Sequence, residues 1–225
     1  MKRILACLAI GLALLFAMPA MADIIIGNPP DPGVGNCFPF GCAYNAEYQQ
    51  VYTSSNFNGP ITIGGLEFYN AQYNSSSTQL PTGTFTISLS TTQADVNSIT
   101  GNFAGNLGSD NTQVFSGSIN QAWEFGNTLH ISLSQAFTYD PAKGNLLVDV
   151  LGTDASTPGG QTFFDVNSNG YFARVYCEDG VACDTGSVDG AYGVVTGFDE
   201  VPEPGTLLLM GAGLLGTLGA VRRRM

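Results

Sequence analysis

The sequence has few positively charged residues. The 225 residues include 7 Lys and Arg against 18 Asp and Glu, which gives a formal net charge of -11. Between residues 23 and 204 only Lys143 and Arg174 oppose all 18 acids, a net charge of -16 for this body. Binding to a phosphate backbone depends on Lys and Arg that displace counterions, so a DNA- or RNA-binding function is excluded.

Histidine is also scarce, because His130 is the only one in the chain. It stands in the alternating run Leu129-His130-Ile131-Ser132-Leu133, which places His130 on the polar face of a strand, opposite the leucines. No Ser-His-Asp or Cys-His arrangement can be assembled around it when the cysteines are oxidised. We therefore expect an exposed strand histidine and no nucleophilic hydrolase chemistry, in line with a protein that we expect not to be an enzyme.

The amino terminus has the three parts of a secretory signal peptide. Two basic residues precede an apolar run over residues 4–18, and Ala20 and Ala22 occupy the small-residue positions of a cleavage site. The apolar run is shorter than the roughly 20 residues that span a bilayer. We expect a signal helix in residues 1–22, cleavage after Ala22, and export through the general secretion machinery.

The carboxyl terminus also has three parts. In order they are the tripeptide Pro202-Glu203-Pro204, an apolar stretch over residues 205–221, and the basic cluster Arg222, Arg223 and Arg224. As a helix, the 17 residues of the stretch rise roughly 25 Å, slightly short of the 30 Å or so of a bilayer core. The basic cluster would stay on the cytoplasmic side and leave the body of the chain on the outer face.

These three parts resemble the PEP-CTERM sorting signal in order and spacing, and we assign residues 201–225 to it. The resemblance implies recognition by an exosortase, a membrane-embedded cysteine protease that cuts near the tripeptide. It also implies an inner-membrane intermediate, held by a C-terminal hydrophobic helix, before transfer to the cell surface or extracellular matrix. The segments 37–42, 48–52 and 144–150 resemble passenger domains that precede such signals, which supports one exported β domain.

The body has the patterning of strands. Short runs of β-branched and aromatic residues alternate with polar ones and are separated by Gly, Asn, Ser and Pro. The runs lie at residues 48–53, 61–69, 84–91, 113–119, 128–138, 145–151, 162–166, 171–177 and 192–198. We expect an all-β fold, an antiparallel β-sandwich of jelly-roll-like type over residues 47–200. Residues 23–46, rich in Gly and Pro, are expected to be loop, and a helical turn is expected only near residues 93–99.

Four cysteines remain once Cys7 leaves with the signal peptide: Cys37, Cys42, Cys177 and Cys183. An even number in an exported chain predicts disulfides, and the close spacings favour pairing 37 with 42 and 177 with 183. Each small loop would contribute about 2 kcal/mol. A zinc site would need tighter spacing, usually two residues between the cysteines, so disulfides are preferred.

One segment matches the beginning of a calcium loop. Asp165, Asn167 and Asn169 offer oxygen ligands at alternate positions, and Gly170 stands where such a loop turns. The position of the required bidentate Glu is taken by Tyr176. We favour a hairpin turn at Asn169-Gly170 between two strands and keep calcium as the weaker alternative. No other cofactor is expected.

Aromatic side chains are the remaining functional feature. Exposed Tyr and Trp rings stack on sugars, and the candidates are Trp123 and the nine tyrosines, among them Tyr44, Tyr48, Tyr52, Tyr69 and Tyr73. We therefore expect a non-enzymatic surface or matrix protein that binds extracellular polysaccharide.

The alternative is an enzyme that acts on that polysaccharide. A glycoside hydrolase or lyase would draw a carboxylate pair from the strands, and the candidates are Glu67, Glu124, Asp149 and Asp165. Glu67 and Asp149 stand in otherwise apolar strands, where alternation can place them on an outer face.

Overall fold

The alternating runs form antiparallel sheets in the computed structural model, which describes residues 23–29, 33–42, 46–71, 73, 76–177 and 183–201. The expected signal helix, its cleavage site and the expected sorting helix lie outside the described residues, as do Pro202, Glu203, Pro204 and the three terminal arginines. Residues 23–200 make one compact unit.

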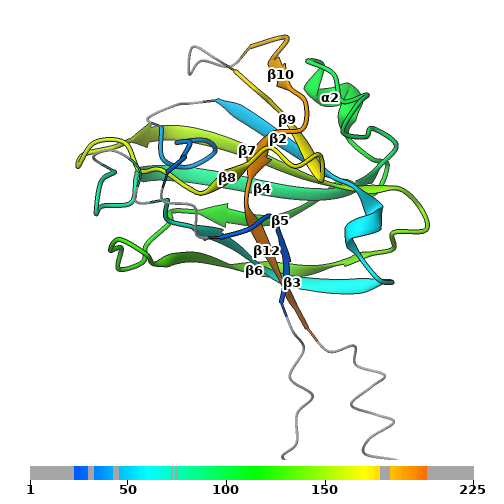
Figure 1. Cartoon of the computed structure of the whole chain (residues 1–225), viewed down its shortest axis with the longest axis horizontal. Coiled ribbons are helices and arrows are strands. Elements are labelled where there is room, and N and C mark those ends of the chain that lie inside the picture. The colour runs from blue at the N-terminus through cyan, green and yellow to red at the C-terminus, as the bar shows by residue number, and fades with distance from the viewer. Residues whose placement is uncertain are drawn as a thin grey trace, which may run out of the picture. The chain divides into compact units, whose positions relative to one another are not determined.

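The first sheet has four strands. Their order is β1 (Ile24–Ile26), β12 (Thr196–Glu200), β3 (Ile61–Tyr69) and β6 (Thr128–Tyr139). All of its pairings are antiparallel. In Figure 1, β3, β6 and β12 lie below β2, β7 and β9 of the second sheet.

The second sheet has six strands. Their order is β10 (Ser187–Asp189), β9 (Phe172–Tyr176), β2 (Glu47–Tyr52), β7 (Asn145–Ser156), β4 (Thr82–Thr92) and β5 (Thr112–Gly117). A further ladder joins β8 (Val166–Asn167) to β11 (Gly193–Val194), and the described residues also form two short helices, η1 (Ser54–Asn56) and α2 (Phe103–Asn106). The order β1-β12-β3-β6 opposite β2-β7-β4-β5 is the wrapping of a jelly roll, so the predicted fold class is confirmed.

Several local predictions were wrong. The predicted strand at residues 162–166 is mostly irregular. Its residue Phe164 makes isolated bridges to Asn36 and Asn70 instead of a continuous ladder. The predicted hairpin does not form: β8 pairs with β11, while β9 pairs with β2 and β10. The apolar β9 is buried between those two strands, so long-range pairing overrides the local turn. Gly170 does adopt the expected positive φ, +77°.

Other boundaries also differ. The expected loop at residues 23–46 contains β1, and β10 is a further strand that the pattern missed. The predicted strand at residues 192–198 is divided between β11 and β12. The helical turn predicted near residues 93–99 is present as a single turn, closed by the bond from the Ile99 amide to the Asp95 carbonyl, and a short helix that was not predicted, α2, follows it.

The space between the sheets is filled by aromatic and aliphatic side chains. Phe40 is completely buried there, and its ring meets those of Phe68, Phe85 and Phe164 edge to face at centroid distances of 4.9, 5.4 and 6.1 Å. Phe40 comes from the loop that the Cys37–Cys42 disulfide closes. An irregular segment thus supplies a central part of the core.

The six-stranded sheet is covered on its other face as well. A second buried cluster packs Val51, Leu147 and Val175 of this sheet against Ile99 and Phe103 from the segment that contains α2. The outer face of the four-stranded sheet instead carries polar side chains, and the candidate site lies there.

We predict that Phe40→Ala lowers the free energy of unfolding of residues 23–200 by about 3–5 kcal/mol, because it empties a fully buried ring position. Urea denaturation with the disulfides intact measures this change. Phe125→Ala is the control, since that ring is 50% exposed. Equal losses in the two variants would contradict the packing described for Phe40.

Candidate functional site

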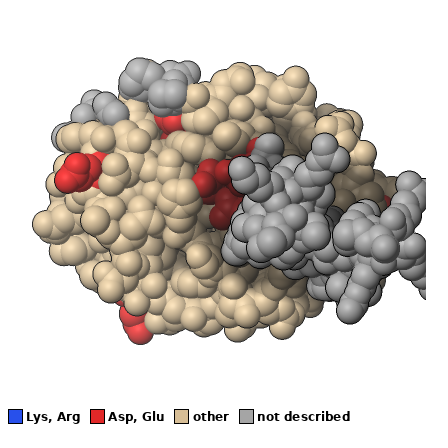
Figure 2. All heavy atoms as spheres, turned by 90° about the horizontal axis from the view of Figure 1, so that it is seen from below, with Lys and Arg blue, Asp and Glu red and all other residues tan. Residues whose placement is uncertain are grey.

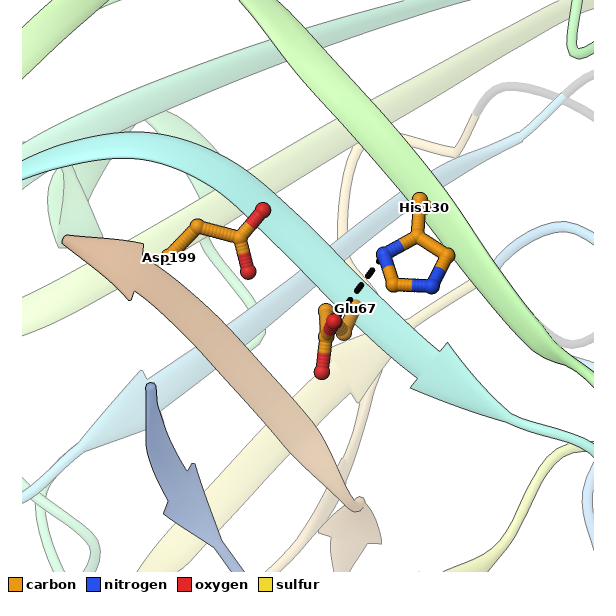
Figure 3. A group of neighbouring side chains, drawn as sticks. All are labelled: Glu67, His130 and Asp199. Atoms are coloured by element: carbon orange, nitrogen blue, oxygen red, sulfur yellow. Dashed lines mark ion pairs between the residues drawn. The ribbon is translucent and has the colours of Figure 1, made fainter. Parts of the chain in front are cut away.

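Glu67, His130 and Asp199 meet on the outer face of the four-stranded sheet. They come from the neighbouring strands β3, β6 and β12 (Figure 3). One ligand atom from each lies within 4.8 Å of the other two. The His130 Nδ1 is 2.9 Å from a carboxylate oxygen of Glu67, and the Tyr69 hydroxyl donates a 2.7 Å hydrogen bond to the other oxygen.

The strand register creates this meeting. Glu67 is opposite His130 on one side and Gly197 on the other, while Asp199 is opposite Gly65. A Cβ atom at Gly65 would lie 2.1 Å from an Asp199 oxygen, and one at Gly197 would lie 2.8 Å from a Glu67 oxygen. Both carboxylates therefore lie over glycines, in space that any other residue would fill.

Negative charge is concentrated at this cluster. Burial raises the pKa of Asp199, the charges of Glu67 and Asp23 raise it further, and His130 partly offsets them. Burial and the bond to Glu67 hold the pKa of Tyr69 well above its usual range. Figure 2, which views the domain from below, shows acidic side chains gathered near the middle of this face. One oxygen of Asp199, Oδ1, is buried and has no hydrogen-bond partner.

The four carboxylates considered for hydrolysis are not brought together. Glu67 lies on the outer face of the four-stranded sheet and Asp149 on the outer face of the six-stranded sheet, the kind of position expected for both. Glu124 is exposed in a loop, and Asp165 is completely buried. His130 is an exposed strand residue, 56% accessible at its side chain, but its contact with Glu67 was not expected.

Another carboxyl pair, Glu47 with Asp149, was not found from the sequence. Burial raises the pKa of Glu47 to about 7, and the nearby Asp149 charge and hydrogen bond contribute. Burial also raises the pKa of Asp149. Glu47 therefore keeps its proton to a higher pH than an exposed glutamate does. Its members belong to β2 and β7, which are adjacent in the sheet but far apart in sequence.

In the segment that resembles a calcium loop, residues 165–170, the asparagine side chains bind backbone amides. The side-chain oxygen of Asn167 accepts a hydrogen bond from the Asn28 amide at 2.6 Å, and that of Asn169 accepts one from the Tyr171 amide at 3.2 Å. Asp165 is completely buried. Both asparagine oxygens thus accept hydrogen bonds from backbone amides, one distant in sequence and one local, which favours a structural role over the calcium alternative.

The two cysteine pairs are confirmed. Cys37 is bonded to Cys42, and Cys177 to Cys183. Three of the aromatic candidates are not available to a sugar, because Tyr48, Tyr52 and Trp123 are buried. Tyr44 lies outside the described residues, whereas Tyr69 and Tyr73 are partly exposed.

Two adjoining hollows share one aromatic residue, Tyr192. The first has a volume of about 440 Å³ and is lined by Val34, Gly35, Tyr73, Val166, Asn167, Ser168 and Tyr192. The second, also about 440 Å³, is lined by Arg174, Val188, Asp189, Gly190 and Tyr192. Tyr192 was not singled out from the sequence, where it is one tyrosine among nine.

Arg174 lines the second hollow and packs against Tyr192, the residue that both hollows share. Its guanidinium lies 4.6 Å from the ring centre of Tyr176 and 4.5 Å from that of Tyr192. Its Nε and Nη2 donate to one oxygen of Asp189 at 2.9 and 2.7 Å. The arginine is 4% exposed, so this ion pair and the two rings are fixed together.

Comparison with known families identifies the end of the chain. Residues 200–224 match the family model of the PEP-CTERM protein-sorting motif. The chain carries a PEP-CTERM sorting motif. The motif begins at the last residue of β12 and includes the proline tripeptide and the arginine cluster. It supports an exported protein, with an exosortase as its processing partner and the cell surface as its destination.

The sorting motif does not describe the body of the chain. No curated protein and no solved structure matches the sequence. In the part of the chain that the structure describes, no helix is long and apolar enough to cross a membrane.

We predict that the Glu47–Asp149 pair makes the domain less stable as pH rises. The folded-state pKa of Glu47, about 7, exceeds its usual 4.5, so the folded state binds more protons between these values. This contribution to stability is complete below about pH 4.5 and is lost as pH rises through about 7. Glu47→Gln should reduce the difference between urea midpoints at pH 5 and pH 8, whereas Glu124→Gln should leave it unchanged. Parallel pH profiles for wild type and Glu47→Gln would contradict the raised pKa of Glu47.

Proposed function

We propose that this chain is an exported, non-enzymatic cell-surface or matrix domain that binds a neutral extracellular polysaccharide. The observation that carries the proposal is the position of Tyr192, whose partly exposed ring lines both hollows. The signal peptide starts export, an inner-membrane intermediate follows, and exosortase processing delivers the domain to the surface.

The first hollow offers the chemistry that sugars require. The partly exposed rings of Tyr73 and Tyr192 supply apolar faces for the C–H side of a pyranose. Asn167 and Ser168 supply neutral hydrogen-bonding groups at the same wall. Because Arg174 covers one face of Tyr192, the ring is already fixed, and little side-chain entropy remains to be lost when a sugar binds.

Charge selects the class of polysaccharide. The body carries a net charge of -16, which repels polyanions at low ionic strength. Arg174 lies in the second hollow, but Asp189 already neutralises it. A polymer of neutral sugars fits this combination, and an acidic one does not.

A non-enzymatic role is supported by the placement of the carboxylates. Glycosidases hold their two carboxyl groups roughly 5–9.5 Å apart around the scissile bond. Glu47 and Asp149 instead lie on the neighbouring strands β2 and β7, and neither lines one of the two hollows. Tyr69, whose pKa is raised, would be a poor general base for a lyase, because a base works best with a pKa near the ambient pH.

We predict that Tyr192→Ala abolishes polysaccharide binding. Affinity electrophoresis of residues 23–200 in gels that contain galactomannan, a neutral polymer, measures it, with alginate gels as the anionic comparison. Tyr192→Phe keeps the ring and should keep most of the retardation. Tyr171→Ala is the matched control, because Tyr171 is 51% exposed and does not line the hollows. Equal mobility of all variants, or retardation by alginate alone, would overturn the proposal.

A separate prediction concerns processing. Replacing Pro202-Glu203-Pro204 with three alanines should leave the C-terminal segment uncut, because the exosortase would lose its recognition sequence. Mass spectrometry of the protein from the producing cells measures the mature mass. A mature mass equal to that expected for normal processing would argue against exosortase cleavage.

A further inference from the structure

We propose that Glu67, His130 and Asp199 bind one divalent cation of the zinc type on the outer face of the four-stranded sheet. This site shares no residue with the two hollows, so metal binding can be tested independently of polysaccharide binding.

The separation of the ligand atoms fits a small cation. The three atoms lie within 4.8 Å of one another, and the His130 nitrogen is 2.9 Å from the Glu67 oxygen. Ligands at zinc bond lengths of about 2.0–2.1 Å in a tetrahedron are roughly 3.3 Å apart. Small side-chain movements would therefore bring all three to one ion.

The donor set selects the class of metal. An imidazole nitrogen with two carboxylates is a combination typical of zinc and similar first-row ions. Calcium instead prefers six to eight oxygen ligands, and the imidazole would take one of those places without supplying an oxygen. Three protein ligands leave at least one coordination position for water or for an oxygen of another molecule.

Two independent observations point to a ligand at this position. Asp199 Oδ1 is buried without a hydrogen-bond partner, although a buried carboxylate oxygen normally has one. Gly65 and Gly197 stand under the two carboxylates, where a Cβ atom would lie 2.1 and 2.8 Å from their oxygens. Glycine weakens a strand, so its presence in β12 and β3 at these two places has a cost that close approach explains.

A fourth residue would orient the site without touching the metal. The Tyr69 hydroxyl donates to the Glu67 oxygen that faces away from His130, and this leaves the other oxygen directed at the imidazole. Such outer partners usually change metal affinity by about 10–100-fold when they are removed. We therefore assign Tyr69 as a positioning residue.

The chain offers an unusually clean test, because residues 23–200 contain one histidine and their four cysteines form disulfides. Isothermal titration with zinc chloride should give saturable binding of one ion per domain. His130→Ala and Asp199→Asn should each weaken it at least about tenfold, and Tyr69→Phe about tenfold. Glu124→Gln, an exposed carboxylate outside the cluster, should bind as the wild type does.

A second measurement identifies the ligand directly. In a ¹⁵N-labelled domain the two imidazole nitrogens give one set of histidine signals, and zinc should shift the Nδ1 signal most. Thermal unfolding confirms that each variant remains folded. The proposal is overturned if zinc binds all variants equally, if no saturable binding occurs, or if calcium alone binds and does so independently of His130.

Discussion

The candidate site depends on an irregularity in strand β3, where the core-facing positions change from odd-numbered to even-numbered residues. Ile61 and Ile63 face the core in its first half, but Leu66 and Phe68 face the core in its second half. The β3–β6 register shifts between Ile63 and Gly65, where two adjacent glycines stand. Without this irregularity, strict alternation would direct Glu67 into the core, and burying its charge would cost several kcal/mol. The bulge instead turns Glu67 outward, beside His130.

The remaining geometry follows from antiparallel pairing around β3. Once Glu67 faces outward, the register fixes which residues of β6 and β12 are its neighbours. A slip of one residue would move every side chain of a strand to the opposite face, and the apolar positions of β12 and β6 would lose their place in the core. Packing of the apolar side chains in the core therefore also fixes the positions of the polar side chains on the opposite face of the same sheet. The glycines opposite Glu67 and Asp199 then allow both carboxylates to lie close to the backbone.

The sequence was sufficient for the fold class, because period-two alternation and turn residues are local signals. Residues 61–69 coincide with β3, and both disulfides follow from short spacings. It was not sufficient for β9, whose partners are chosen by burial rather than by the neighbouring turn. The metal cluster was missed for the same reason, since Asp199 carries no local signal that connects it with His130. Tyr192 could be distinguished from buried tyrosines such as Tyr52 only by its surroundings.

The two candidate sites, the hollows beside Tyr192 and the cluster of Glu67, His130 and Asp199, share no residue, and the sorting motif would bring both to the cell surface. The most direct test of the metal-binding face is anomalous diffraction at the zinc edge from crystals of residues 23–200 grown with zinc. We expect one strong peak bounded by Glu67, His130 and Asp199, at bonding distance from the imidazole Nδ1. Zinc located elsewhere, with this cluster empty, would contradict the account.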